Sequence, residues 1–193
     1  DLIGAYDRYT LSPRWPDRRF EVSGAGAQTR ALARRTSSRG VSLDDTSTIV
    51  AAGPWIVAVT GTPAGSPRIG DPRVHALDAQ TGEIAWSVDV ANLDPALESS
   101  IVRGRPILSA GVVVVAATRQ LAQRRLESVQ LVGLDLASGR MLWRTPLASA
   151  GSLPYNAANS SADGGVEWNG LVIRSDELGV LGAVDIASGR PEW

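Results

Sequence analysis

The chain of 193 residues contains no cysteine and no lysine, and it has a single histidine. Without cysteine, it cannot form disulfides, zinc–thiolate sites or cysteine nucleophiles. Without lysine, Schiff-base chemistry and a phosphate-binding P-loop are excluded, since all 19 basic residues are arginine. A Ser-His-Asp triad would have to use His75, and a metal site built on several histidines cannot form.

The chain also lacks a charge excess and a long apolar run. Its 19 basic and 20 acidic residues give a net charge of −1, which argues against nucleic-acid binding because that function needs a basic surface. The longest apolar run, Val112–Ala117, is too short to cross a membrane, so we predict no transmembrane segment in this stretch. The sequence begins at Asp1 without a signal-like segment, and we expect targeting information to be absent or cut away.

One pattern of eleven residues occurs three times, at residues 76–86, 133–143 and 183–193. Each copy has a small residue, Leu or Val, Asp, two variable residues, Ser or Thr, Gly, three variable residues and Trp. The shared positions are Asp78, Thr81, Gly82, Trp86, Asp135, Ser138, Gly139, Trp143, Asp185, Ser188, Gly189 and Trp193. The copies end 57 residues (86 to 143) and 50 residues (143 to 193) apart, a recurrence that is not due to chance. We find no copy in residues 1–41.

The pattern predicts a tight β-hairpin that carries a large aromatic side chain. The Asp ends one strand, and its carboxylate can accept hydrogen bonds from backbone N–H groups in the turn; the Ser or Thr can do the same more weakly. The Gly supplies the positive φ that a tight hairpin needs. The Trp lies on the second strand, where we expect it to wedge between neighbouring sheets, because such aromatic side chains bury about 150–250 Å².

Apolar, β-rich runs precede each hairpin and complete a unit of four short antiparallel strands. These runs are Thr48–Ala52, Trp55–Thr60, Pro106–Ala110, Val112–Thr118 and Leu171–Arg174. Four strands repeated about every 50 residues, with one Trp in each repeat, predict an all-β β-propeller with about three blades present. Only two patches, Thr29–Arg35 and Arg119–Glu127, have an ambiguous helical pattern.

We divide the chain into an N-terminal segment and a set of propeller repeats. Residues 1–41 are a degenerate blade or a linker. Residues 42–193 hold blades near 42–90, 103–147 and 166–193, the last of them incomplete. Because a ring of seven or eight blades needs roughly 350–400 residues, we expect a fragment of such a ring. A compact four-bladed ring that uses residues 1–41 as its fourth blade is the alternative.

The repeated motif resembles that of the pyrroloquinoline-quinone (PQQ)-type β-propeller repeat family, A-x-D-x-x-T-G-x-x-x-W. Residues Ala76–Trp86 match every fixed position, whereas the other two copies have Ser for Thr and the second has Gly for Ala. The resemblance covers residues 42–193. The family contains quinoprotein dehydrogenases, which bind PQQ and calcium and oxidise alcohols or sugars. It also contains non-catalytic propellers, such as the lipoprotein of the bacterial outer-membrane assembly machinery. Because the motif serves blade packing, it indicates the fold and is shared by both classes.

The non-catalytic class is favoured here, and the question of an enzyme stays open. Many of the dehydrogenases carry a vicinal Cys pair at the quinone, which this chain lacks. No set of Asp, Glu or Asn residues can be matched to the calcium ligands or the catalytic base, so no catalytic residue is assigned and no cofactor is evident. We expect a scaffold that binds a protein partner or the remaining blades of the same chain. The resemblance implies a location in the periplasm or cell envelope. The alternative is part of a PQQ- and calcium-dependent dehydrogenase.

Long connections are expected on one face of the disc, because second-to-third and blade-to-blade connections leave an antiparallel blade at the same end. They are Gly61–Pro72, Ala91–Arg105, Arg119–Ser128 and Ala148–Glu167. Long loops on a rigid scaffold are where binding usually occurs. Tyr155, Asn156 and Asn159 are the candidate ligand-face residues, with loop capping by Asn as the alternative.

Two other groups have a simpler structural interpretation. Arg119, Arg124 and Arg125 could bind an acidic partner, but a solvated hairpin tip is the favoured interpretation. His75 lies on a third strand beside the motif, where a structural role is favoured over a catalytic one.

Overall fold

The structure, a computed structural model, describes residues 2–3, 5–10, 12–15, 20–21, 49–60, 73–121, 126–151, 165–175 and 179–193. Within these residues the chain is almost entirely β-structure, joined by two short 3-10 turns. The strands are β1 (Leu2–Ile3), β2 (Phe20–Glu21), β3 (Ile49–Ala52), β4 (Trp55–Thr60), β5 (Arg73–Asp78), β6 (Ile84–Val88), β7 (Ile101–Ser109), β8 (Val112–Leu121), β9 (Leu126–Asp135), β10 (Met141–Gly151), β11 (Val166–Trp168), β12 (Leu171–Ser175) and β13 (Leu181–Asp185).

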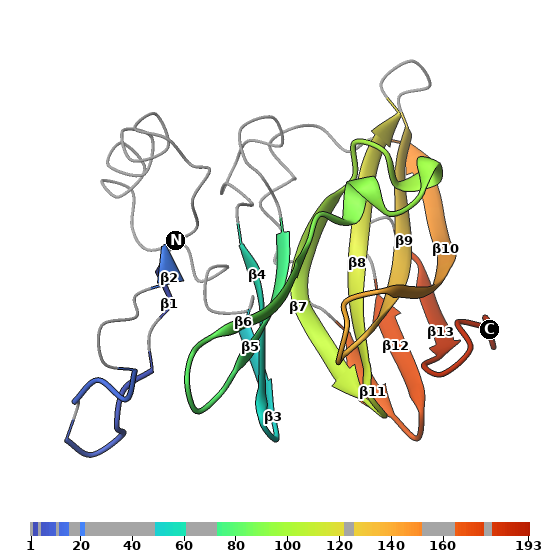
Figure 1. The fold of residues 1–193 in the computed structure, drawn as a ribbon. Helices are drawn as coiled ribbons and strands as arrows, with labels where there is room; N and C mark the ends of the chain where they lie inside the picture. The colour runs from blue at the N-terminus through green and yellow to red at the C-terminus, as the bar shows by residue number, and fades with distance from the viewer. Residues whose placement is uncertain are drawn as a thin grey trace.

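The sheets are antiparallel and follow chain order, as a propeller blade requires. Blade 1 has the order β3-β4-β5-β6, blade 2 the order β7-β8-β9-β10, and blade 3 the order β11-β12-β13. A bridge between Val184 and Pro191 adds the start of a fourth strand to blade 3. Figure 1 shows the three sheets standing side by side like a fan. The predicted all-β propeller architecture is therefore confirmed.

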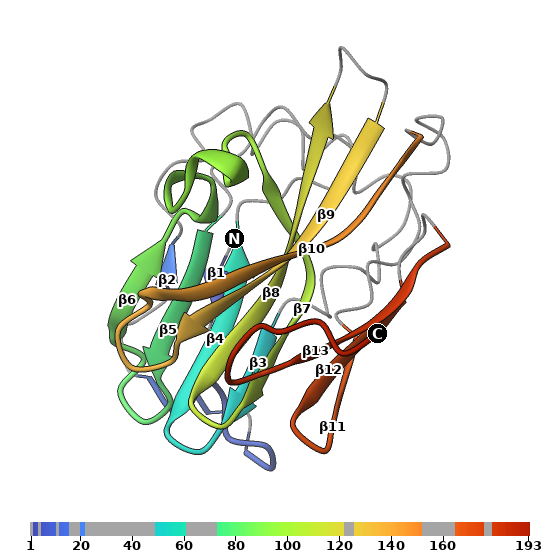
Figure 2. The same cartoon turned by 90° about the vertical axis from the view of Figure 1, so that its right-hand side faces the viewer.

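The first strands of the blades lie together. Strand β7 contacts β3 and β4 of blade 1 and β11 of blade 3, so the first strands form the inner side of the fan. The tight turns all lie at one end of the sheets. The strand ends that lead into the longer connections lie at the other end, which we call the long-connection face (Figures 1 and 2). The two 3-10 turns η3 (Val90–Asn92) and η4 (Pro95–Leu97) lie on this face, between β6 and β7.

A fourth copy of the hairpin, at residues 5–15, was not found in the sequence. Ala5, Asp7, Thr10 and Trp15 occupy the Ala, Asp, Thr and Trp positions of the motif, while Leu11 replaces the glycine. The backbone N–H of Asp7 donates to Ser12, as that of Asp78 does to Glu83 in blade 1. The expectation that residues 1–41 hold no copy is therefore wrong. We call residues 5–15 the N-terminal hairpin.

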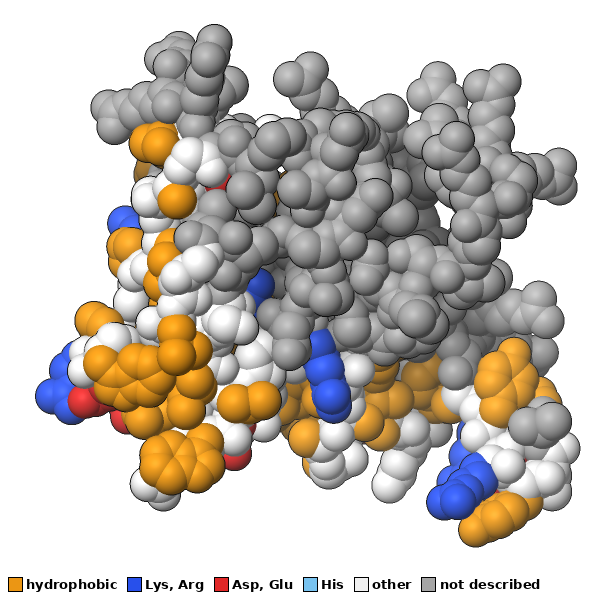
Figure 3. Space-filling model, turned by 180° about the vertical axis from the view of Figure 1, so that it is seen from behind, with side chains coloured by type: hydrophobic (Ala, Val, Ile, Leu, Met, Phe, Trp, Pro, Cys, Tyr) orange, Lys and Arg blue, Asp and Glu red, His pale blue; other side chains and the backbone are white. Residues whose placement is uncertain are grey.

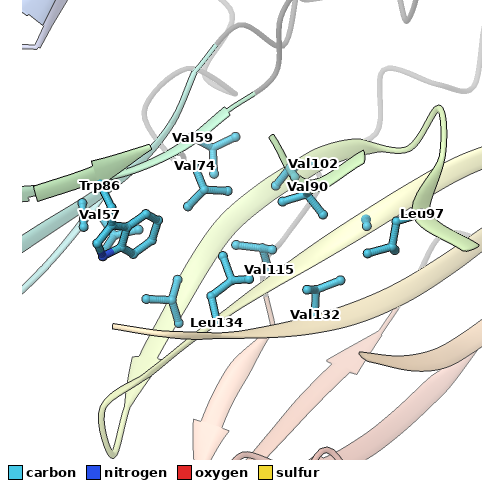
Figure 4. Close-up of a cluster of buried hydrophobic side chains, with 13 residues drawn as sticks. Val57, Val59, Val74, Trp86, Val90, Leu97, Val102, Val115, Val132 and Leu134 are labelled. Atoms are coloured by element: carbon cyan, nitrogen blue, oxygen red, sulfur yellow. The ribbon is translucent and has the colours of Figure 1, made fainter. Parts of the chain in front are cut away.

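The hydrophobic core consists of separate layers between neighbouring blades rather than one central cluster. The layer between blades 1 and 2 contains Trp86 with aliphatic side chains from both sheets (Figure 4). The layer between blades 2 and 3 contains Trp143, Val172 and Ile186. Trp15 packs with Leu77 between the N-terminal hairpin and blade 1. Because strand side chains alternate between the two faces of a sheet, each blade can contribute to two layers.

Blade 2 differs from the prediction at its upper end. Residues 119–121 continue β8 and residues 126–128 belong to β9, so the expected long connection shrinks to residues 122–125, which lie outside the described part. The described residues of the ambiguous helical patch, 119–121 and 126–127, are strand, because each of them pairs across the hairpin, as Arg119 does with Ser128. Likewise β7 begins at Ile101, which shortens the connection from blade 1, and β10 extends to Gly151.

Candidate functional site

The motif aspartates hold the hairpin turns through the hydrogen bonds that the sequence suggests. Asp78 Oδ1 accepts the backbone N–H groups of Gln80 and Thr81 at 2.8 and 2.7 Å. The N–H of Thr81 makes the largest contribution to lowering the pKa of Asp78, because it stabilises the ionised carboxylate. The turn is therefore fixed by a charged side chain at the end of its first strand.

The two serine copies use the same arrangement with an additional hydroxyl. Asp135 Oδ1 accepts the N–H of Ser138 at 2.8 Å and its hydroxyl at 2.6 Å. Asp185 accepts the same two groups of Ser188 at 2.8 and 2.6 Å. In both copies the serine hydroxyl is the main cause of a lowered aspartate pKa. These aspartates are thus engaged in the turns rather than available as general bases.

Each described seam between blades carries one indole that donates to the main chain of the next hairpin. Trp86 Nε1 lies 2.8 Å from the carbonyl oxygen of Leu136. Trp143 Nε1 lies 2.9 Å from that of Ile186. In both cases the acceptor directly follows the motif Asp. The tryptophans therefore recognise the backbone of the neighbouring hairpin in addition to filling the seam.

The motif glycines provide the surface on which these indoles lie. An added Cβ on Gly139 would be 2.7 Å from the Trp86 ring, and one on Gly189 would be 2.5 Å from the Trp143 ring. Both glycines also have positive φ, at 71° and 72°. Thr145 supports the second seam by donating its hydroxyl to the Gly189 carbonyl. At Gly139 and Gly189, glycine thus serves both the turn and the seam.

Trp15 was missed by the sequence analysis and occupies the same position in the preceding seam. It is 4% exposed, and its Nε1 donates to the Ala79 carbonyl at 3.2 Å. An added Cβ on Gly82 would be 2.6 Å from its ring. The signal available was the spacing of Asp7 and Trp15, which equals that of Asp78 and Trp86.

Trp193 differs from the other motif tryptophans because it is 61% exposed. The wedge role expected for this residue stays a prediction, because the described residues include no hairpin after it. Val166, Trp168 and Leu181 of blade 3 are also exposed. In the view from behind, hydrophobic side chains gather toward both lateral ends of the molecule (Figure 3). The four-bladed ring is also wrong, because the N-terminal hairpin and blade 3 lie at opposite ends of the fan (Figure 1).

A cap formed by residues 89–100 is the best-described part of the long-connection face. Asp89 and Asp94 begin its two 3-10 turns by accepting the N–H groups of Ala91 and Ala96 at 3.0 and 2.7 Å. The bond from Ala96 is the main cause of the lowered pKa of Asp94. After the second turn, Ser99 adopts a φ of 62°, which is uncommon for a residue with a side chain.

Side chains of blade 2 hold this cap in place. Arg144 Nε lies 3.2 Å from Asp94 Oδ1, and its guanidinium also donates to Gln130 Oε1 at 3.2 Å. The amide of the buried Gln130 donates to the Ala96 carbonyl at 3.1 Å. Arg119 also reaches this carbonyl, so it is not the solvated tip residue that the sequence suggested. The cap is therefore anchored to blade 2 by side chains of that blade.

The other residues that the sequence suggested for a functional site are not part of the cap. Tyr155, Asn156 and Asn159 lie outside the described residues. His75 is buried, and its Nε2 lies 2.9 Å from the Thr60 hydroxyl, which fits a structural role. In the described part of the chain, no three His, Asp or Glu side chains are grouped to hold a metal ion. The same residues include no helix with the length and apolar character of a membrane span.

Comparison with known proteins agrees with this architecture. Residues 22–193 match the family model described as outer membrane protein assembly factor BamB. No curated protein matches the chain. The whole chain aligns with 32% of the quinohemoprotein alcohol dehydrogenase from Comamonas testosteroni, with a TM-score of 0.56 and 14% identity. It thus spans about a third of that protein's length, and the similarity shows a shared fold. A quinohemoprotein alcohol dehydrogenase, ADHIIG from Pseudomonas putida HK5, aligns over 75% of the chain and 25% of its own length, with a TM-score of 0.47 and 19% identity.

Proposed function

Because the chain belongs to the propeller family of outer membrane protein assembly factor BamB, we propose that it is a non-catalytic scaffold in the bacterial cell envelope. It binds a protein partner through its long-connection face. The observation that carries this proposal is the anchored cap at residues 89–100. A segment between two blades would be expected to vary in position unless side chains hold it. Here Arg144 and Gln130 of blade 2 hold it through Asp94 and Ala96.

The cap offers a partner an ordered surface at low entropic cost. Asn92, Pro95, Glu98 and Ser99 are exposed on it. Ser99 keeps its positive φ there, which is the kind of backbone strain that occurs at functional surfaces. Binding to an ordered surface avoids the free energy needed to order a mobile loop. These features support a recognition role for the cap.

The chain's lack of cysteine allows a direct test with single-cysteine variants. Glu98→Cys puts a single thiol on the cap, and Ala137→Cys puts one on an exposed tight turn at the opposite end of blade 2. A thiol-reactive crosslinker is attached to each variant. We expect the cap variant to capture one defined protein from the cell envelope and the turn variant not to capture it. Arg144→Ala should reduce the capture because the cap loses its ion pair with Asp94. Equal capture by both single-cysteine variants would argue against binding through this face.

The alternative is a contribution to a PQQ- and calcium-dependent dehydrogenase of alcohols or sugars. The shared fold with a quinohemoprotein alcohol dehydrogenase supports this alternative. Calcium prefers six to eight oxygen ligands, several of them carboxylates. The described residues contain no cluster of three or more acidic or histidine side chains. The motif aspartates already accept hydrogen bonds within their turns. The described residues therefore do not fit a calcium site. Dye-linked oxidation of alcohols or sugars by the chain, dependent on added PQQ and calcium, would overturn the scaffold proposal.

A further inference from the structure

In the described part of the chain, blade 3 has a neighbouring blade on one face only. Val172 of β12 lies in the layer shared with blade 2. Its neighbours Leu171 and Ile173 therefore face the other way, together with Trp168 and Val166, with which they pair on β11. Hydrophobic side chains gather at this end of the molecule in Figure 3. We call this side the outer face of blade 3; its exposed large apolar residues are Val166, Trp168, Leu181 and Trp193.

The same positions of blade 2 are buried beneath blade 3. A shift of 50 residues (135 to 185) between the motif copies matches Leu131 with Leu181 and Trp143 with Trp193. Leu131 is 1% exposed, whereas Leu181 is 60% exposed. Trp143 and Trp193 differ in the same way, at 9% and 61%. Because the residue types are the same, the difference comes from the sheet that covers blade 2. The outer face of blade 3 therefore has the composition of a seam.

The three described seams show what a motif Trp contacts on the neighbouring unit. At each seam the indole N–H donates to the carbonyl of the residue after the motif Asp, at 2.8 to 3.2 Å. The ring covers the turn glycine, and an added Cβ on Gly82, Gly139 or Gly189 would lie 2.5 to 2.7 Å from it. The receptor for a motif Trp is thus a hairpin with an Asp-x-x-Ser/Thr-Gly turn.

We propose that the outer face of blade 3 binds a further hairpin unit of this repeat, supplied by polypeptide other than residues 1–193. Trp193 donates its indole N–H to the carbonyl after the Asp of that unit, and its ring lies on the turn glycine. The sheet of the same unit covers Leu181, as blade 3 covers Leu131. This contact lies apart from the long-connection face and does not rest on the function proposed for that face.

A second copy of residues 1–193 does not supply such a hairpin. Its three hairpins with a turn glycine already hold the tryptophans of the preceding units. The other one, the N-terminal hairpin, has Leu11 at the glycine position. At every described seam the ring lies within 2.7 Å of the place that a Cβ would take, so a larger residue would overpack the contact. Head-to-tail joining of identical chains through Trp193, which would lead to open-ended assembly, is therefore disfavoured.

An internal duplication tests the outer face with the full chain. Blade 3 belongs to residues 144–193, which follow Trp143, so a copy of residues 144–193 appended after Trp193 gives Trp193 the same neighbour. We expect hydrogen exchange of the Trp193 indole N–H to slow by about tenfold or more, since the new hydrogen bond protects it. Its NMR signal is assigned by comparison with Trp193→Phe. In the matched control the appended copy carries Gly189→Ala, and the protection should be lost.

Urea unfolding gives a second measurement that does not depend on the appended glycine. Trp193→Ala should lower the urea midpoint of the extended chain and leave that of the 193-residue chain nearly unchanged. Leu181→Ala should behave in the same way. Unprotected exchange of the Trp193 indole in the extended chain, or equal midpoint shifts in the two chains, would show that the outer face is not a seam and would overturn the proposal.

Sedimentation equilibrium of the 193-residue chain tests the choice of occupant. We expect a monomer, because no free hairpin with a turn glycine is available on a second copy. A dimer that Trp193→Ala dissociates would make a second copy the occupant of the outer face, and the proposal would be wrong. Neither measurement involves the cap, so failure here is distinct from failure of the scaffold proposal.

Discussion

The indole nitrogen of Trp143 lies 2.9 Å from the carbonyl oxygen of Ile186, which is 43 residues further along the chain. This hydrogen bond crosses the seam between blades 2 and 3, where the Trp143 ring covers Gly189. The same relationship joins Trp86 to Leu136 and Trp15 to Ala79. The stability of each blade therefore depends on the main-chain geometry of the next.

Replacing Trp143 by Ala should lower the free energy of unfolding by roughly 3–5 kcal/mol, because it opens a cavity in a seam. The side chain is 9% exposed and loses its hydrogen bond as well. Trp193→Ala is the matched control, and we expect it to change stability by less than about 0.5 kcal/mol, as most surface substitutions do. Urea unfolding of both variants measures the difference. Similar losses in the two variants would contradict the assignment of Trp143 to a seam.

Gly139→Ala should destabilise the chain more than Gly111→Ala. Both glycines have positive φ, at 71° and 77°, so both substitutions carry a similar backbone cost. Only at Gly139 would the new Cβ meet the Trp86 ring, at 2.7 Å, whereas nothing lies within 4 Å of it at Gly111. We expect the difference to be about 1–3 kcal/mol, the usual effect of overpacking. Equal thermal midpoints for the two variants would show that the indole does not rest on Gly139.

Ala110→Asn should stabilise the chain by about 0.5–1 kcal/mol, because asparagine tolerates the left-handed conformation better than alanine. Ala110 has a φ of 50° in the two-residue turn between β7 and β8. The equivalent turn of blade 3 already has asparagine, at Asn169, with a φ of 52°. The reverse substitution, Asn169→Ala, should therefore destabilise by a similar amount. Thermal unfolding of the two variants should show shifts of opposite sign.

Stability should fall in acid as the motif aspartates become protonated. The pKa of Asp135 is below its usual value of 3.8 in the folded chain, chiefly because the Ser138 hydroxyl donates to the carboxylate. A group whose pKa is lower when folded stabilises the fold above the unfolded-state pKa, and this contribution disappears as pH falls through the folded-state pKa. Asp78 and Asp185 act with the same sign.

Urea midpoints measured between neutral pH and the acid limit test this dependence. At pH values well above 3.8 these aspartates stay ionised, so they should not change the urea midpoint. Below that pH their protonation should lower the midpoint. Asp135→Asn should have a shallower decline, because the amide cannot titrate. Glu127→Gln is the control, since this carboxylate on β9 is outside the motif. An unchanged slope in Asp135→Asn would show that the turn does not depend on the charge.

The hairpins could be predicted from the sequence because their determinants are local. Asp135 contacts Ser138 within the turn, and Gly139 lies next to it, so three positions define the structure. The N-terminal hairpin was missed because Leu11 takes the place of the glycine, which removes the most visible turn signal. Its Asp7 still accepts the N–H groups of Tyr9 and Thr10 at 3.0 Å each. The aspartate can thus hold this turn without the glycine of the other copies.

The cap and the extension of blade 2 could not be predicted in the same way. Residues 119–121 and 126–128 show no clear alternation of polar and apolar side chains, so only pairing such as Arg119 with Ser128 makes them strand. The cap depends on Arg144 and Asp94, which are separated by 50 residues (94 to 144). No local pattern relates two such positions. Long-range contacts of this kind appear only when the blades are assembled.

The acceptors of the seam hydrogen bonds are main-chain carbonyls, at Ala79, Leu136 and Ile186. The side chain of the residue after each motif Asp therefore takes no part in this hydrogen bond, and it is different at each of the three seams. A repeat joined in this manner can be duplicated and then diverge in its surface residues without losing its connection to its neighbours. The seam requires a glycine on which the Trp ring can lie. The other surface residues of each repeat can change without breaking this contact.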